Sequence, residues 1–102
     1  MGFFDMFKRK DMSIEIKEYL NNGAIVLDVR TQGEWDAGHS VGAKHIVLNL
    51  IPLQLDTIKS WNKPVIAVCL SGGRSGQAVQ FLKNNGIDAV NGGPWQNVDQ
   101  FL

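Results

Sequence analysis

The sequence predicts an α/β fold, with a small parallel sheet of four to five strands and helices on both faces. Short apolar runs, which are typical of strands buried in a parallel sheet, occur at residues 24–29, 45–48, 64–68 and 87–90. Segments with apolar residues at helical spacing separate these runs. Because strands and helices alternate along the chain, we expect parallel strands joined by right-handed crossovers.

The first half of the chain contributes two of these strands. A helix over residues 13–20 ends at an Asn-Asn-Gly stop signal, and the first strand follows it. Thr31 is placed to cap a short helix over residues 34–37. After the second strand, a helix is predicted over residues 50–61, with a proline in its first turn.

The second half of the chain contributes the other two strands. The strand at residues 64–68 leads through a polar segment into a helix over residues 75–84, which presents Ala78, Phe81 and Leu82 on one face. A second Asn-Asn-Gly signal ends this helix before the last strand. Residues 94–101 are predicted to form a final helix.

Length and charge restrict the kind of protein. A chain of 102 residues is long enough for one hydrophobic core and too short for two, so we expect an extension over residues 1–12 and one domain over residues 13–102. Ten basic and ten acidic residues give no net charge, which argues against nucleic acid or a membrane surface as the main partner.

The start of the chain does not resemble a secretory signal, because apolar residues precede the basic ones. The predicted location is therefore the cytoplasm, without stable membrane insertion. We expect a monomer or a weak dimer.

Cys69, the single cysteine, stands where a thiol is expected to be reactive. It ends the apolar strand at residues 64–68 and lies just before a helix N-terminus. Free N–H groups and the positive end of the helix dipole favour an anion at such a place. As the sole cysteine, it excludes an internal disulfide, a cysteine-cluster zinc site and a resolving cysteine within the chain.

The segment after Cys69 has the composition of an anion cradle. Two glycines let the backbone curl so that successive N–H groups point inward, an arginine adds positive charge, and a serine is placed to cap the next helix. The candidate anion-binding residues are Leu70, Ser71, Gly72, Gly73, Arg74 and Ser75. The alternative is a small buried cysteine without chemistry, but such a strand end does not require this loop.

Three segments carry a resemblance to a known family. The first comprises residues 26–30, Glu34-Trp35 and residues 38–46; the second is residues 69–75, and the third is Gly-Gly-Pro-Trp at residues 92–95. In this order and spacing the chain resembles the rhodanese-like sulfurtransferase family, from about Ser13 to the C-terminus.

The resemblance implies a rhodanese-like fold and a single-domain sulfurtransferase. Cys69 would accept a sulfane sulfur from thiosulfate or another persulfide donor and carry it as a persulfide. It would then pass the sulfur to a thiol or protein acceptor, or to cyanide, which is covalent catalysis by double displacement. The expected partners are a small-molecule sulfur donor and a thiol or protein acceptor, with no cofactor and no metal.

Two other functions are compatible with the loop. Cysteine phosphatases, which share the nucleophile, place one residue more between cysteine and arginine than the four found here. The shorter loop suits one sulfur atom better than the tetrahedral phosphate or arsenate of a phosphatase or arsenate reductase. The second alternative is a non-catalytic or partner-dependent persulfide carrier in a sulfur relay. Since Arg74 is the loop's sole cation, we expect weak binding of thiosulfate, with KM towards or above ~1 mM.

Charged residues at the end of the first strand are predicted to support the site. We expect Asp28 and Arg30 to form a structural ion-pair network that includes Glu34. His39 and His45 lack metal-ligand spacing with any partner, so a hydrogen-bonding role is predicted for both.

Two features depart from the family pattern. Residues 8–12 make a poor strand, so the strand that precedes the first helix in many members is expected to be missing or irregular. Ser40 stands where a branched apolar residue is expected, and Val41 is predicted to supply the packing instead.

Overall fold

The computed structural model describes residues 12–102. The predicted extension up to residue 11, and the question of a strand within it, lie outside the described residues. Within the described part, one sheet of four parallel strands has the order β2-β1-β3-β4, which confirms the predicted α/β fold class. The strands are β1 (Ile25–Asp28), β2 (Lys44–His45), β3 (Val65–Cys69) and β4 (Ala89–Pro94).

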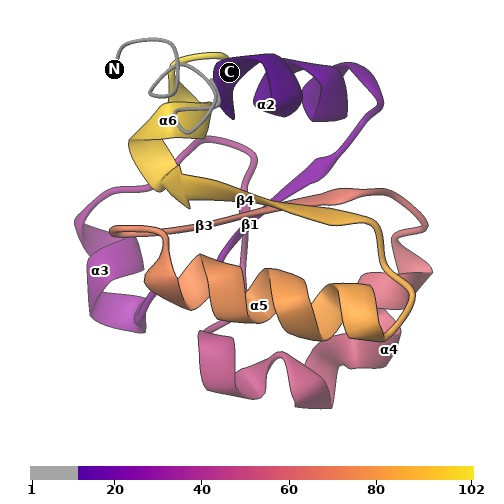
Figure 1. Cartoon of the computed structure of the whole chain (residues 1–102). Helices are drawn as coiled ribbons and strands as arrows, with labels where there is room; N and C mark the ends of the chain where they lie inside the picture. The colour runs from indigo at the N-terminus through magenta and orange to yellow at the C-terminus, as the bar shows by residue number, and fades with distance from the viewer. Residues whose placement is uncertain (1–11) are drawn as a thin grey trace, which may run out of the picture.

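Helices cover both faces of this sheet, as predicted, giving three layers (Figure 1). The helices are α2 (Met12–Asn21), α3 (Gln32–Ala37), α4 (Leu55–Ser60), α5 (Gly73–Asn84) and α6 (Trp95–Asp99). Helices α2 and α6 lie on one face, and α4 and α5 lie on the other. None of the helices in the described part is long and apolar enough to cross a membrane.

Strand β3 lies at the centre of the core, and all five of its residues are buried. Because side chains alternate along a strand, Ala67 and Cys69 pack with the cluster on the α4 and α5 face. Ile66 and Val68 pack with the cluster on the α2 and α6 face. The alternation therefore directs the sulfur of Cys69 toward the face that α5 covers.

The second strand and the helix after it are shorter than the sequence predicted. Strand β2 pairs only two residues with β1, and two 3₁₀ turns, Leu48–Leu50 and Pro52–Gln54, stand where the helix was expected to start. The backbone leaves the helical region at Gln54, which has φ of −104° and ψ of 12°. Helix α4 then forms only from Leu55 onward.

The last strand runs further than predicted, through two glycines. In the pairing of β3 with β4, Ala67 lies opposite Asn91 and Val68 opposite Gly93, so Gly92 is the extra residue of a bulge. A Cβ at Gly92 would lie 2.9 Å from side-chain atoms of Ile66, Val68 and Val98. The close approach of this strand to α6 therefore requires a glycine.

The predicted packing role of Val41 is wrong. Its side chain is 90% exposed, and Ala43 packs against the α2 and α6 cluster instead. Ser40 is buried, and its hydroxyl has no partner among the described residues.

Candidate active site

Cys69 ends β3, and the chain turns sharply from it into α5. Gly72 is the residue before the helix and has φ of 103°, in the left-handed region that favours glycine. The prediction that Ser75 caps the helix is wrong, because the helix already begins at Gly73 and Ser75 lies within its first turn. Its hydroxyl points to the sulfur of Cys69, which has no exposed surface.

Hydrogen bonds converge on this sulfur. The N–H of Gly72 donates to Sγ at 2.9 Å, and Oγ of Ser75 lies 3.3 Å from it. Burial raises the pKa of Cys69, but hydrogen bonds from the Ser75 hydroxyl and from the N–H groups of Ser75, Gly72 and Ser71 outweigh it and hold the pKa below its ordinary value. Of the predicted cradle residues, Ser71, Gly72 and Ser75 thus donate toward the sulfur, and anion binding by the loop stays a prediction.

Asn91, which no sequence motif marks as a site residue, joins β4 to the cysteine loop. Its Nδ2 donates to the carbonyl of Gly72 at 2.9 Å. Its Oδ1 accepts from the N–H of Gly93 at 2.9 Å and lies 2.6 Å from the hydroxyl of Ser75, whose single proton can be donated to this oxygen or to Sγ. In the sequence, this role is indicated only by the position of Asn91 directly before the Gly-Gly pair. These glycines form the bulge, and the bulge sets the direction of the Asn91 side chain.

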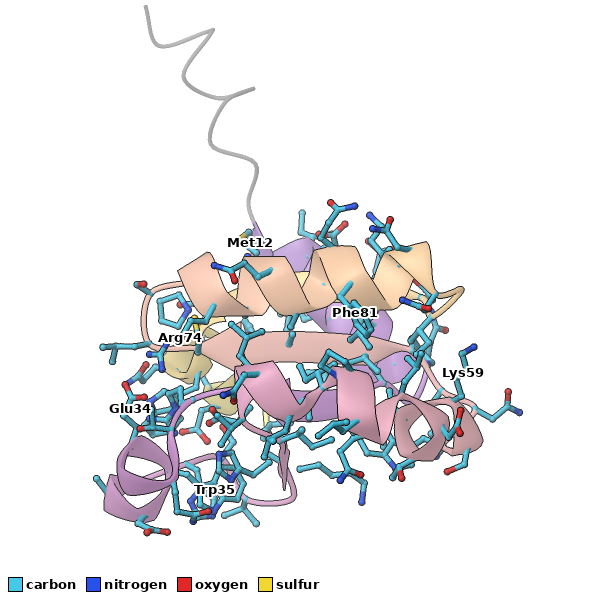
Figure 2. All side chains as sticks on the ribbon, turned by 90° about the horizontal axis from the view of Figure 1, so that it is seen from below. Met12, Glu34, Trp35, Lys59, Arg74 and Phe81 are labelled. Carbon is cyan, nitrogen blue, oxygen red and sulfur yellow. The ribbon has the colours of Figure 1, made fainter. Side chains whose placement is uncertain are left out.

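Arg74 is paired with Glu34 of α3 rather than being free. Nη1 and Nη2 donate to the two carboxylate oxygens at 2.7 and 3.0 Å, and Figure 2 shows both residues at one end of the molecule. Arg74 lowers the pKa of Glu34 to about 2, with a further contribution from hydrogen bonds of Thr31. The prediction that Glu34 joins the network of Asp28 and Arg30 is therefore wrong, because Glu34 pairs with Arg74.

Asp28 and Arg30 form a buried ion pair behind the site, as predicted. Nε and Nη2 of Arg30 donate to the carboxylate at 2.8 to 3.0 Å, and Nη2 also donates to the carbonyl of Gly38 at 2.7 Å. The guanidinium lies 5.1 Å from the ring centre of Trp95. Because these bonds are charge-assisted and shielded from water, the pair fixes the end of β1 and the loop beyond α3.

The two histidines stack on Trp35, which Figure 2 labels near Glu34. The ring centres of His39 and His45 lie 3.5 and 4.7 Å from that of Trp35. His39 Nδ1 contacts the carbonyl of Trp35 at 2.8 Å, and His45 Nε2 contacts that of Arg30 at 2.8 Å. These contacts fit the predicted hydrogen-bonding role. Within residues 12–102, no three His, Cys, Asp or Glu side chains gather as a metal site.

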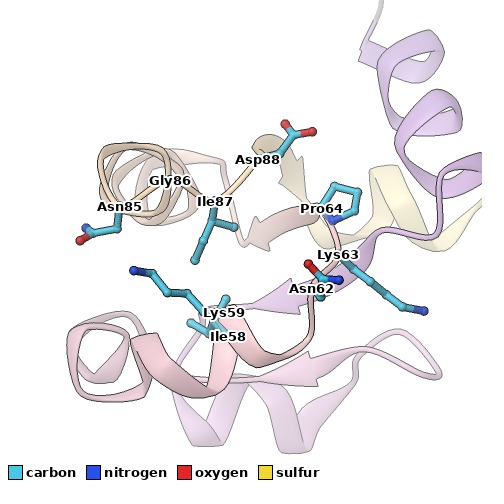
Figure 3. A pocket seen from close by; sticks show the side chains of 9 residues that line it. All are labelled: Ile58, Lys59, Asn62, Lys63, Pro64, Asn85, Gly86, Ile87 and Asp88. Carbon is cyan, nitrogen blue, oxygen red and sulfur yellow. The ribbon is translucent and has the colours of Figure 1, made fainter.

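A pocket of about 400 Å³ lies away from Cys69, where the chain enters β3 and β4 (Figure 3). Its lining includes Lys59, Lys63 and Asp88. Cys69 stands at the opposite, carboxyl end of β3, the edge at which ligands bind in parallel sheets. This pocket therefore does not belong to the cysteine site.

Comparison with known proteins decides the family. The model of the rhodanese-like domain matches residues 13–93. The chain belongs to the rhodanese-like family. This confirms the resemblance noted in the sequence.

Curated relatives of this rhodanese-like chain include proteins named for sulfur transfer. The chain is 38% identical over 67 residues to the uncharacterized protein YqhL of Bacillus subtilis, a match that covers 66% of the chain and 52% of that protein. It is 34% identical over 68 residues to the thiosulfate sulfurtransferase GlpE of Pseudomonas fluorescens, covering 67% of the chain and 62% of the relative. The chain thus spans about half to three fifths of the length of these two relatives.

Solved structures show the same rhodanese-like fold. A protein of Staphylococcus saprophyticus is 37% identical with a TM-score of 0.70, covering 84% of this chain and 88% of that one. A rhodanese-like domain protein of Staphylococcus aureus is 34% identical with a TM-score of 0.66, covering 85% and 86%.

Proposed function

We propose that the protein is a sulfurtransferase in which Cys69 carries sulfane sulfur as a persulfide. The observation that carries the proposal is the convergence of the Ser75 hydroxyl and three backbone N–H groups on Sγ, which lowers the pKa of Cys69. These donors stabilise a thiolate, which is the nucleophilic form of the residue. The relatives named as thiosulfate sulfurtransferases give the proposal its reaction class.

In the first half of the reaction, the Cys69 thiolate attacks the terminal sulfur of the donor. The new bond joins Sγ to that sulfur, and the donor's sulfur–sulfur bond breaks. When the donor is thiosulfate, sulfite leaves with the bonding electron pair. When the donor is a thiol persulfide, the corresponding thiolate leaves with that pair. The N–H groups of the loop then face a persulfide anion in place of the thiolate, so the same dipoles stabilise both states.

In the second half, an external nucleophile attacks the terminal sulfur of the persulfide. Cyanide takes this sulfur as thiocyanate, a thiol takes it as a new persulfide, and Sγ leaves as thiolate. The acceptor must come from outside, since the chain has no second cysteine. The cycle restores Cys69 without a net change of oxidation state in the protein.

The arrangement around Cys69 does not favour phosphoryl transfer. Such a reaction needs a protonated group for the leaving oxygen, and a catalytic acid has a pKa near the working pH. Glu34 has a pKa of about 2 and is bound to Arg74, and Asp28 is buried in its pair with Arg30. Neither carboxylate is suited to that role.

The proposal is tested by the intact mass of the protein after incubation with thiosulfate, and separately with a thiol persulfide. We expect a gain of one sulfur that cyanide removes as thiocyanate. The Cys69→Ser variant is the control and should gain nothing. Failure of both donors to load the wild-type protein would refute the proposal.

Burial of the sulfur favours a second candidate, a partner-dependent persulfide carrier. Sγ has no exposed surface, so a donor reaches it only when the loop at residues 70–72 shifts. A docking protein would supply that shift in a relay. This candidate predicts fast loading from a protein persulfide and slow loading from every small donor, which the same mass measurement resolves in time.

A further inference from the structure

Arg30 follows β1, and Arg74 follows the loop after the neighbouring strand β3; each of these two arginines is paired with a carboxylate. Arg30 is held by Asp28, and Arg74 is held by Glu34. The charges of these four groups cancel, so the Cys69 thiolate leaves the site with a net negative charge. An anionic donor therefore meets no free cation among these groups.

The pair of Arg74 and Glu34 is held in place from both sides. Both guanidinium NH₂ groups of Arg74 are engaged, at 2.7 and 3.0 Å. The carboxylate of Glu34 also accepts from the N–H and the hydroxyl of Thr31, at 3.0 and 2.9 Å, in the capping box of α3. About a third of each side chain is exposed, so water screens the pair only in part.

Arg74 is nevertheless within electrostatic reach of the sulfur. Glu34 is the main reason that the pKa of Arg74 is raised, and the Cys69 thiolate contributes to the same shift. If released from Glu34, this guanidinium would be the natural partner of an oxyanion brought to Cys69. Leu70, beside the thiol, is 57% exposed and offers a donor an apolar surface instead.

We propose that Glu34 is a specificity-determining residue that keeps Arg74 occupied, so that the site accepts persulfides of low charge and disfavours the thiosulfate dianion. The inference rests on the proposed function, because it concerns the donor that loads Cys69. It assigns to Glu34 a repulsive role: discrimination comes from withholding a cation, not from a contact with the preferred donor.

The test compares two donors with wild-type protein, Glu34→Gln and Asp36→Asn. The donors are thiosulfate and cysteamine persulfide, whose ammonium group leaves it without net negative charge. Glutamine also serves at this position of a capping box, so Glu34→Gln keeps the helix start and removes the charge. Asp36 lies on the same helix, bonded to Gln32 at 2.9 Å, so its variant removes an equal charge that does not touch Arg74.

The measured quantity is the ratio of kcat/KM for thiosulfate to kcat/KM for cysteamine persulfide, with cyanide as acceptor. A change in the thiolate fraction of Cys69 cancels in this ratio, because both donors meet the same sulfur. We expect Glu34→Gln to raise the ratio roughly tenfold, the effect of about one charge-assisted hydrogen bond. Asp36→Asn should leave it unchanged, and added salt should reduce the gain.

The outcomes separate this inference from the proposed function. An unchanged ratio in Glu34→Gln, or an equal rise in Asp36→Asn, would overturn the role of Glu34 while sulfur transfer stood. A wild-type KM for thiosulfate in the low micromolar range would overturn it as well. A wild-type protein that neither donor loads would overturn both.

Discussion

At the scale of single residues, the chemistry of Cys69 is set by a competition between burial and hydrogen bonding. Removing the thiol from water disfavours its ionised form, whereas each N–H or O–H aimed at Sγ favours it. The hydrogen bonds prevail here because the turn at Gly72 brings backbone donors together without adding a side chain that would need its own partners. Backbone N–H groups and one hydroxyl thus lower the pKa of this thiol, as a metal or a free cation does elsewhere.

Ser75→Ala should raise the pKa of Cys69. The hydroxyl is the largest of the groups that lower it, and one hydrogen bond to a charged group contributes about 1.5–3 kcal/mol, or roughly 1–2 pH units. The measurement is the rate of alkylation against pH, whose midpoint in the wild-type protein should lie below the free-thiol value of ~8.5. A wild-type midpoint at or above that value would contradict the cradle.

Ser71→Ala is the matched control for this measurement. Ser71 acts on the sulfur through its backbone N–H, which alanine retains, and its side chain is exposed. The alkylation midpoint should therefore stay at the wild-type pH. Equal shifts in the two variants would mean that the Ser75 hydroxyl has no particular role.

The residues around Cys69 differ in how far the sequence could predict them. The cysteine, the glycines and Ser75 lie within a few positions of one another, so local pattern was enough to place them together. Glu34 and Asn91 come from segments distant in the chain, and their contacts depend on how α3 and the bulged β4 are oriented in three dimensions. Sequence pattern accordingly pairs Glu34 with the wrong arginine and does not indicate Asn91.

At the scale of elements, the short helix α3 links local capping to the site. Thr31 begins the helix with a capping box, in which its hydroxyl accepts from the N–H of Glu34. The same residue then orients the carboxylate that pairs with Arg74. A capping motif that was predictable from sequence therefore positions an ion pair that was not.

Thr31→Ala should lower the free energy of unfolding by about 1 kcal/mol, the usual cost of losing an N-cap hydroxyl. It should also raise the pKa of Glu34 from about 2, since one of the groups that lower it is lost. Denaturant unfolding and an NMR titration of the carboxyl group measure the two effects.

The sign of the pH dependence follows from the depressed pKa. A carboxylate with a folded pKa of about 2 contributes stability above its unfolded pKa of ~4.3, and this contribution is lost as pH falls through the folded value. The difference in stability between wild type and Thr31→Ala should thus be largest above pH ~4.3 and shrink below it. A difference that grew on acidification would contradict this account.

Elements whose pattern is unambiguous were predicted well, and the exceptions have local causes. The five apolar residues of β3 and the apolar face of α5 are where the periodicity placed them. Strand β2 is short because only two of its residues pair with β1, and apolar character alone does not reveal where pairing stops. Strand β4 is long because glycines, which usually indicate a turn, here continue the ladder through a bulge.

At the scale of the whole molecule, the sheet separates two apolar clusters, one on each of its faces. The α4 and α5 cluster includes Cys69, whereas the α2 and α6 cluster includes Val98. A hydrogen bond of 2.6 Å from Tyr19 to Asp88 ties α2 to the start of β4 and raises the pKa of Tyr19 to about 12. The bulge in β4 joins both halves, since Gly92 packs toward α6 while Asn91 reaches the cysteine loop.

Gly92→Ala should therefore disturb both stability and the site. A Cβ 2.9 Å from Ile66, Val68 and Val98 overpacks the α2 and α6 cluster, which typically costs about 1–3 kcal/mol. Relief of that clash moves β4, and with it the Asn91 side chain, whose Nδ2 holds the carbonyl of Gly72 and so helps to fix the turn whose N–H donates to Sγ. We expect a lower midpoint in urea unfolding together with a higher alkylation midpoint of Cys69.

Gly33→Ala provides the comparison on an element that the clash does not reach. Gly33 lies in the first turn of α3 and does not have a positive φ, and a Cβ added there would have no other atom within 4 Å. Alanine at this position should leave stability unchanged or raise it slightly, because it restricts the unfolded chain. If Gly92→Ala lowered stability while the alkylation midpoint of Cys69 stayed fixed, the bulge would be a packing device alone, and the coupling between the α6 face and the thiol would be disproved.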